Sequence, residues 1–251
     1  MKVKNILISQ PKPSTEKSPY FDMEAKYGVH FFFHQFIRVE GFTPKEFRKQ
    51  HISILDYSAI IFTSRLGVDH FFRLCEEMRI TMPDSMHYYC PTEAIGNYLA
   101  KYIQFRKRKV FFSESGKMTD LLPHMRRHPE DKFLMVVADV YNDDVIKTFA
   151  QHNIEIHPAV MYRTVVNEFS EEEKQDYDMY VLFTPMGVAG FQKNYPDFEH
   201  GEHIIASYGA ATAKALRDAN IQIDIEAPSK ECPSITAAID AFLKENHKRT
   251  R

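Results

Sequence analysis

The stretch VLFTPMGVAGF at residues 181–191 has the pattern of a strand that passes through a tight turn into a helix. A similar stretch, IIFTSRLGVDHFF, stands at residues 60–72. Both contain an apolar run, Phe-Thr, a short break, Gly-Val and a phenylalanine; aligned on Phe-Thr, the first copy has one extra residue in the break. Tyr57 precedes the first copy and Tyr177 the second. The repetition predicts one strand–turn–helix unit in each half of the chain.

The length and composition are those of an ordinary globular protein. The 251 residues suffice for one large domain or for two domains of about 100 to 130 residues each. A hydrophobic content of 44% with 26% charged residues is enough for a real core. The formal net charge of −2 at pH 7 gives no field that favours nucleic acid or an anionic membrane. An anionic ligand must therefore be held by local groups.

The cysteines and the N-terminal residues help to predict the cellular compartment of the protein. Cys75, Cys90 and Cys232 are far apart and show no paired spacing, which favours a reducing compartment. The start, MKVKNILISQP, has only a short apolar run and predicts a first strand rather than a secretory signal. No apolar run approaches the roughly 20 residues that a membrane span needs. We therefore expect a soluble, cytoplasmic protein.

Short apolar runs alternate with helical patterns along the chain, which indicates parallel sheets in an α/β architecture. Two longer β-rich stretches interrupt this alternation and predict two crossings between domains. The expected fold class is α/β, with two parallel-sheet domains joined by a two-stranded β linker and an active cleft between them. The expected boundaries are 1–31 with 169–251 for domain one, 32–49 and 156–168 for the linkers, and 50–155 for domain two.

Three hydroxyl residues fall where a ligand site is expected in such sheets. Ligands bind beyond the carboxyl ends of parallel strands, and Thr63, Ser64 and Thr184 stand at those ends. Hydroxyls there cap the next helix, whose unpaired N–H groups bind anions. A third candidate is IIASYGAATAKAL at 204–216, where Gly209 permits a tight turn before a helix of small residues. The pattern fits an anion site, although helix capping alone also accounts for these residues.

Other chemistry is poorly supported by the sequence. No G-x-G-x-x-G, G-x-x-x-x-G-K-[ST] or H-E-x-x-H motif occurs, so dinucleotide, P-loop and zincin sites have no basis. His30 and His34 lie in a predicted strand, where such a spacing separates residues by about 13 Å, and no metal site is expected there. The basic cluster FRKRKVFF at 105–112 fits a solvated edge or a site for carboxylate or phosphate.

Five segments, in order, resemble the motifs of the uroporphyrinogen-III synthase family, and the likeness spans nearly the whole chain. The opening SPYFDMEAKYGV at 18–29 is also similar to that of eukaryotic-type members. The five segments are DYSAIIFTSRLGV (56–68), VMYRTV (160–165), VLFTPMG (181–187), SYGAATAKALRDANI (207–221) and CPSITAAIDAF (232–242).

This chain departs from the family pattern at several positions within or near those motifs. The segment PTEAIGNYL departs most, and it weakens any assignment of substrate contacts to its loop. The departures are Gly67 for alanine, Thr184 and Met186 for two serines, Ala211 and Ser234 for threonines, Asn220 for glycine, Thr92 for glycine and Ile95 for threonine.

The resemblance implies a cyclising hydro-lyase of haem biosynthesis that needs no cofactor and no metal. Members take the linear tetrapyrrole hydroxymethylbilane, invert ring D and close the macrocycle with loss of water to give uroporphyrinogen III. The implied path runs through an azafulvene and a spiro-pyrrolenine, followed by fragmentation and reclosure. The implied partner is this polycarboxylate small molecule, bound by a monomer with neither nucleic acid nor membrane. Eight substrate carboxylates match the anion sites expected at the helix N-termini.

The resemblance also implies roles for single residues. Tyr162 matches the family's tyrosine, and its phenol can protonate a departing hydroxyl as a general acid; packing between domains is the alternative role. Because the azafulvene also cyclises spontaneously, we expect single substitutions to lower activity rather than abolish it. The implied substrate-binding residues are Thr63, Ser64, Thr184, Pro185, Met186, Gly187, Tyr208, Gly209 and Thr212.

Two other classes of protein remain open at this stage. One is a two-domain module that closes on a small molecule without chemistry, although the lack of an export signal counts against a periplasmic version. The other is a degenerate synthase-like protein kept for regulation, which the replacement of a family serine by Met186 leaves open.

Overall fold

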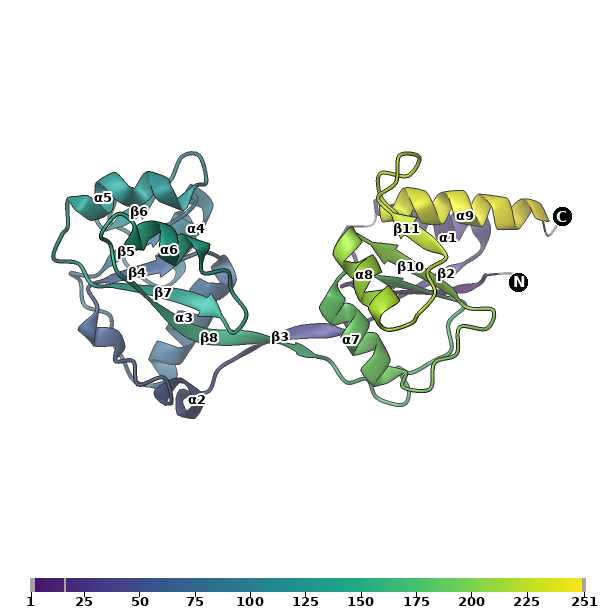
Figure 1. Ribbon diagram of the computed structural model, residues 1–251, viewed down its shortest axis with the longest axis horizontal. Coiled ribbons are helices and arrows are strands. Elements are labelled where there is room, and N and C mark those ends of the chain that lie inside the picture. Colours follow the sequence, from purple (N-terminus) through teal and green to yellow (C-terminus); the bar gives the residue numbers. More distant parts are fainter. Residues whose placement is uncertain (1–2, 16, 250–251) are drawn as a thin grey trace. The chain divides into compact units, whose positions relative to one another are not determined.

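The computed structural model describes residues 3–15 and 17–249, and the chain divides into two compact units (Figure 1). The first unit is built from Met1–Arg38 and Val165–Arg251, and the second from Val39–Thr164. Each unit has its own sheet of largely parallel strands with helices on both faces. The α/β fold class predicted from the sequence is confirmed. No helix in the described ranges is both long and apolar enough to cross a membrane.

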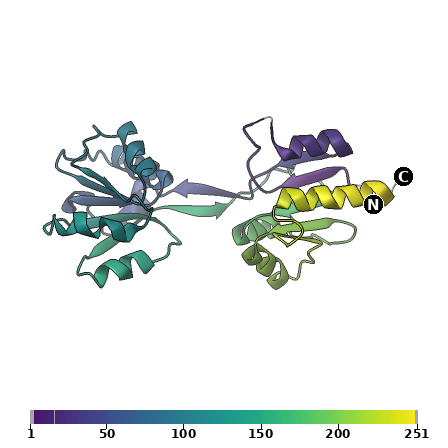
Figure 2. The same ribbon diagram turned by 90° about the horizontal axis from the view of Figure 1, so that it is seen from above.

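The first unit contains five parallel strands, with α1 and α9 packed on one face of the sheet and α7 and α8 on the other (Figure 2). In spatial order the strands are β11 (Ile225–Ala227), β10 (Ile204–Tyr208), β9 (Met179–Leu182), β1 (Asn5–Ile8) and β2 (His30–Phe33). The helices are α1 (Pro19–Tyr27), α7 (Pro185–Asn194), α8 (Ala210–Asp218) and α9 (Ile235–Arg249).

Strand β1, which lies between β9 and β2, shows why this sheet needs helices on both faces. Ile6 and Ile8 lie in the core beneath α1 and α9, whereas Leu7 points into the core beneath α7 and α8. All three side chains are fully buried. A strand covered on both faces reads as a continuous apolar run, as NILI does here. The helix α1 ends at Gly28, whose φ of 66° is the left-handed conformation common for a glycine after a helix.

The second unit contains six strands, of which β8, β7, β4, β5 and β6 pair in parallel. The spatial order is β3 (Ile37–Gly41), β8 (Ile156–Val166), β7 (Phe133–Ala138), β4 (Ala59–Phe62), β5 (His87–Cys90) and β6 (Val110–Phe112). The α-helices are α2 (Pro44–Arg48), α3 (Arg65–Glu77), α4 (Glu93–Tyr98), α5 (Leu122–Arg126) and α6 (Asp144–Ala150). Short 3₁₀ turns are η1 (Ile54–Asp56), η2 (Leu99–Lys101) and η3 (Met118–Leu121).

The two faces of this second sheet carry separate cores. Helices α3 and α4 pack on one face, and α5 and α6 pack on the other. The edge strand β3 runs antiparallel to β8, because the Phe42 amide donates to the Met161 carbonyl and the Asn167 amide donates to the Phe36 carbonyl. The chain therefore leaves the first unit along β3 and returns to it along β8.

The sequence repeat corresponds to equivalent elements in the two units. Strand β4 is followed by α3, and β9 is followed by α7. Ser64 caps α3 as Thr184 caps α7, and each cap is followed three residues later by a buried glycine, Gly67 or Gly187. Every equivalent position differs by the same 120 residues. The helix caps align the two copies without an insertion, so the prediction of an extra residue in the first copy is wrong. The two Phe-Thr pairs are not structurally equivalent.

The strand order reverses beside the repeated strand of each unit, between β4 and β7 in the second unit and between β1 and β9 in the first. In the second unit the chain goes from β4 outward to β6 and then returns to β7 on the other side of β4. In the first unit β1 is followed by β2 on one side and later by β9 on the other. Crevices form at the carboxyl ends of strands on either side of such a switch. Ser64 and Thr184 both stand at a switch point.

Candidate active-site residues

In the second unit, the loop after β4 brings two predicted residues together. Ser64 is the N-cap of α3, and its Oγ accepts a hydrogen bond from the Gly67 amide at 3.0 Å. The same Oγ lies 3.4 Å from the hydroxyl oxygen of Tyr162, with either oxygen able to donate. Thr63 precedes the cap and is exposed. Two hydroxyls and the free amides of a helix N-terminus therefore meet at one point.

A β-bulge in β8 directs Tyr162 toward this point. Val137 of β7 pairs with Val160, but the next residue, Ala138, pairs with Tyr162, so Met161 is the extra residue. Val160 packs in the core beneath α5 and α6, whereas Met161 and Tyr162 both pack in the core beneath α3. Regular alternation would send Tyr162 to the other face of the sheet. The bulge re-aims this side chain, a use of bulges that is common beside active sites.

His70 of α3 completes the surroundings of Tyr162. Its imidazole stacks on the Tyr162 ring, with 5.2 Å between centroids and 19° between planes. Burial, reinforced by the charge of Arg73, lowers the pKa of His70 below its usual value, while Asp69 acts in the opposite direction. His70 is not among the site residues predicted from the sequence. Its position three residues after Gly67 on the same predicted helix was a usable signal.

The residue after Tyr162 fixes β8 to its neighbours. Arg163 bonds Glu40 of β3 and Glu46 of α2, each at 2.8 Å. Glu46 also belongs to a capping box with Thr43. The Thr43 amide and the Arg163 guanidinium lower the pKa of Glu46 to about 2. This network holds the strand segment that carries Tyr162.

In the first unit, Thr184 is the N-cap of α7, as Ser64 is the N-cap of α3. Its Oγ1 accepts a hydrogen bond from the Gly187 amide at 2.9 Å, and Pro185 occupies the first turn of α7. Met186 is 41% exposed and is thus free to meet a ligand. Ser9, which follows β1 across the switch point, has its Oγ 4.0 Å from where a Cβ on Gly187 would lie. Ser9 had no motif to mark it in the sequence.

The neighbouring strand β10 ends beside the same turn. Tyr208 is 38% exposed, and its ring lies 6.0 Å from that of Phe183 between centroids. Gly209 has φ 89° and donates its amide to the Ala227 carbonyl at 2.7 Å, which sets the start of α8. Thr212 is only 2% exposed, so its hydroxyl lies beneath the helix end rather than at its surface.

The chemistry of the two groups of residues is that of anion binding and proton transfer. The N-termini of α3, α7 and α8 offer amides and, at α3 and α7, cap hydroxyls to carboxylates. The phenol of Tyr162 can give a proton to a leaving oxygen. Within residues 3–15 and 17–249, side chains grouped so that they could hold a metal ion lie at the amino ends of β5 and β7, away from these residues.

Comparisons with known proteins agree with the resemblance seen in the sequence. The family model described as uroporphyrinogen-III synthase HemD matches residues 25–237. A uroporphyrinogen-III synthase from Saccharomyces cerevisiae (strain ATCC 204508 / S288c) is 25% identical over 144 residues, 51% of this chain and 51% of the yeast protein. The match thus spans about half the length of that curated relative.

The fold also has a solved counterpart. The crystal structure of uroporphyrinogen-III synthetase from Helicobacter pylori 26695 aligns with a TM-score of 0.56 and 14% identity, covering 96% of this chain and 99% of that one. At this identity the likeness concerns the fold alone. The family match over most of the chain confirms the family expected from the sequence: this chain belongs to the uroporphyrinogen-III synthase family.

Proposed function

We propose that this protein is a uroporphyrinogen-III synthase, a lyase that cyclises hydroxymethylbilane with inversion of ring D and loss of water. The observation that carries the proposal is the position of Tyr162 in a chain of this family. Its hydroxyl oxygen lies 3.4 Å from Ser64 Oγ at the N-terminus of α3, and a bulge directs it there. A tyrosine used only for packing needs neither the bulge nor a polar partner at a helix N-terminus.

In the proposed reaction Tyr162 acts as the general acid. The C–O bond of the terminal hydroxymethyl group breaks as the pyrrole nitrogen supplies electrons, and the phenol protonates the departing oxygen, which leaves as water. The pyrrole N–H proton passes to the phenolate, which leaves a neutral azafulvene, and ring D then attacks this azafulvene through the spiro intermediate. Ser64 orients the phenol through their hydrogen bond, and His70 fixes the plane of its ring. Positioning of this kind reduces the entropy lost on reaching the transition state.

The helix N-termini are proposed to bind the substrate carboxylates. Backbone amides and hydroxyls can hold many carboxylates without a strongly basic surface, which agrees with a net charge of −2. Thr212, being buried, would act by shaping the start of α8 rather than through its hydroxyl. The proposed binding residues are Thr63, Ser64, Thr184, Pro185, Met186, Gly187, Tyr208, Gly209 and Thr212.

The rest of the proposal concerns conditions and partners. We propose a reaction without cofactor, carried out by a monomer in the cytoplasm and without a nucleic-acid partner. Three free cysteines, two of them buried, support a reducing compartment. The near-neutral charge gives no support to nucleic-acid binding.

An isomer assay tests the proposed activity directly. Purified protein is supplied with hydroxymethylbilane generated enzymatically in the same mixture, and the type I and type III products are separated by chromatography after oxidation. We expect type III to dominate over the type I isomer that forms spontaneously. Type I alone, at the rate of a mixture without the protein, would leave a ligand-binding or regulatory role and remove the synthase proposal.

A further inference from the structure

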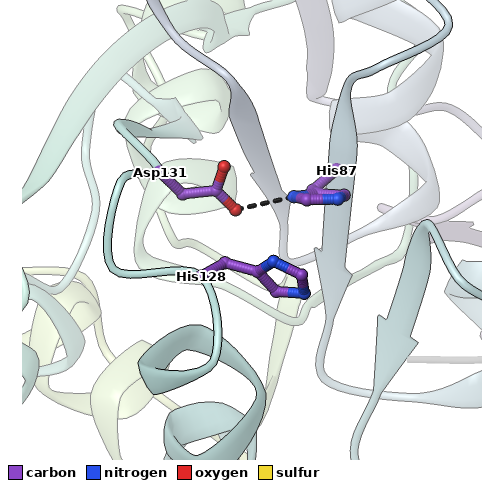
Figure 3. A group of neighbouring side chains, drawn as sticks. All are labelled: His87, His128 and Asp131. Carbon is purple, nitrogen blue, oxygen red and sulfur yellow. Dashed lines mark hydrogen bonds and ion pairs between the residues drawn. The ribbon is translucent and has the colours of Figure 1, made fainter.

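Two histidines and an aspartate meet at the amino ends of β5 and β7 in the second sheet, whereas Ser64 follows the carboxyl end of β4. His87 is the first residue of β5, His128 follows α5, and Asp131 stands just before β7. One ligand atom from each of the three lies within 4.8 Å of the other two. Figure 3 shows the side chains converging from the strand and from the loop that leads into β7.

The donor set and its spacing suit a zinc ion. His87 Nδ1 lies 2.7 Å from Asp131 Oδ2, and the rings of His87 and His128 are 4.3 Å apart between centroids. Tetrahedral zinc, with bonds near 2.1 Å, separates its ligand atoms by about 3.4 Å. On binding zinc, the close pair would open by about 0.7 Å and His128, the more exposed of the two histidines, would move in through rotation of its side chain. Imidazole with one carboxylate favours zinc over calcium or magnesium.

The carboxylate of this cluster is buried and already oriented. The side chain of Asp131 is only 4% exposed. Ser58 Oγ donates to Asp131 Oδ1 at 2.7 Å, and the Tyr89 hydroxyl reaches Oδ2 at 3.4 Å. A buried carboxylate needs positive charge nearby, which a bound cation provides. Hydrogen bonds from a second layer of residues are also what orients the ligands of metal sites.

The cluster is accessible from solvent on one side. The His128 side chain is 29% exposed, the most of the three. A pocket of about 490 Å³ adjoins the cluster and is lined by His128 and Asp131, together with His152 and His157. An ion can therefore enter, and water can supply the fourth ligand that three-residue zinc sites take.

We propose that His87, His128 and Asp131 form a zinc-binding site with water as the fourth ligand. The ion ties the loop between α5 and β7 to the start of β5, and so stabilises the second unit. The site lies away from Tyr162 and does not rest on the proposed function. Zinc binding and synthase activity are measured separately. Activity without zinc binding would overturn only the zinc proposal, and zinc binding without activity would overturn only the proposed function.

Zinc alone is the probe, and the full chain is used without a purification tag. The protein is treated with chelator, dialysed and titrated with zinc chloride by calorimetry, while its melting temperature is followed in parallel. We expect one saturable equivalent, and a melting temperature higher by about 5 °C once zinc is in hundredfold excess over its dissociation constant. Cobalt in place of zinc should give the intense visible bands of tetrahedral coordination.

Matched histidine variants identify the site. His128→Ala should abolish the saturable binding and the rise in melting temperature, and a side chain that is 29% exposed should tolerate the change. His152→Ala removes a histidine of the adjoining pocket that is outside the cluster, and it should keep both signals. Absence of saturable binding by the unaltered protein, or unaltered binding by the His128 variant, overturns the proposal. The cluster would then be a hydrogen-bonded His–Asp group that binds no metal.

Discussion

The hydroxyl oxygens of Tyr162 and Ser64 lie 3.4 Å apart, although 98 residues separate them in the chain. Two local features create this contact. The helix cap fixes Ser64 by its bond to the Gly67 amide, and the bulge at Met161 turns Tyr162 to the same face of the sheet. The contact thus joins the start of α3, which follows β4, to β8. These two strands are not neighbours in the sheet, because β7 lies between them.

Replacement of Tyr162 by phenylalanine tests the phenol while keeping the ring that stacks on His70. We expect type III formation to fall by at least about tenfold, because a positioned acid contributes roughly 10²- to 10⁴-fold and spontaneous loss of hydroxide replaces part of it. The measurement is the initial rate of type III formation. Tyr141→Phe, an exposed tyrosine of the same unit, is the control and should be neutral. An unchanged rate in the Tyr162 variant would assign this residue to packing.

The two equivalent caps predict matched losses of stability. Ser64→Ala and Thr184→Ala each remove the side-chain acceptor of a helix N-terminus, which costs about 1 kcal/mol. Ser64→Thr and Thr184→Ser keep the acceptor and should cost little. Urea denaturation, followed by circular dichroism, measures the free energy of unfolding. If alanine proves as stable as the hydroxyl residue at both positions, the caps are not what stabilises α3 and α7.

Replacement of glycine by alanine should raise the free energy of unfolding at Gly67 of α3 and lower it at Gly190 of α7. A Cβ on Gly67 would lie 3.4 Å from Ser64 Oγ and 3.9 Å from the Tyr162 ring, which is ordinary contact. Gly67→Ala, the family's usual residue, should therefore stabilise α3 by about 0.5 kcal/mol through helix propensity. A Cβ on Gly190 would lie 2.7 Å from the Phe36 carbonyl oxygen. Gly190→Ala should cost about 1 to 3 kcal/mol, as overpacking does.

These two variants are compared by thermal and urea unfolding in one buffer. The Gly67 variant should also keep its activity, because the added methyl group meets no atom closer than normal packing distance. Destabilisation by Gly67→Ala would mean that the start of α3 cannot accept the family's usual residue in this chain.

The Glu46 network predicts a pH-dependent contribution to stability. The Thr43 amide and Arg163 lower the pKa of Glu46 to about 2, from a model-peptide value near 4.5. Because the folded-state pKa is the lower one, the stabilisation is complete above about pH 4.5 and is lost as the pH falls toward 2. Glu46→Gln should lower the melting temperature at pH 7, and the difference from the unaltered protein should shrink below pH 4.5.

The control for this effect is Glu114→Gln, an exposed glutamate of the same unit. Its melting temperature should follow that of the unaltered protein across the range from pH 7 to pH 3. A gap for Glu46→Gln that stays constant with pH would show that charge on this carboxylate is not the source of its contribution.

Much of the fold was predictable because it follows from local pattern. Apolar runs such as NILI and AIIF mark strands covered on both faces, and Gly28 marks the end of α1. These signals need only a few neighbouring residues. The family was predictable for a related reason, since its motifs stand at strand ends where helices begin.

The features that sequence reasoning missed depend on register and on distant residues. The bulge at Met161 has no sequence mark, yet it decides which face of the sheet Tyr162 occupies. The alignment of the two repeats was misjudged by one residue, because the Phe-Thr pairs are more conspicuous than the caps. His87 and Asp131 are 44 residues apart and meet only because β5 and β7 lie on either side of β4.

The insertion of the second unit within the first has a consequence for synthesis on the ribosome. Strand β1 is the middle strand between β2 and β9, and β9 ends only at residue 182. At typical elongation rates, roughly 10 to 30 s pass between the synthesis of β1 and that of its partner strand β9. Meanwhile residues 39–164 can leave the exit tunnel and fold as a unit. Until β9 emerges, the unpaired side of β1 is open to non-native contacts.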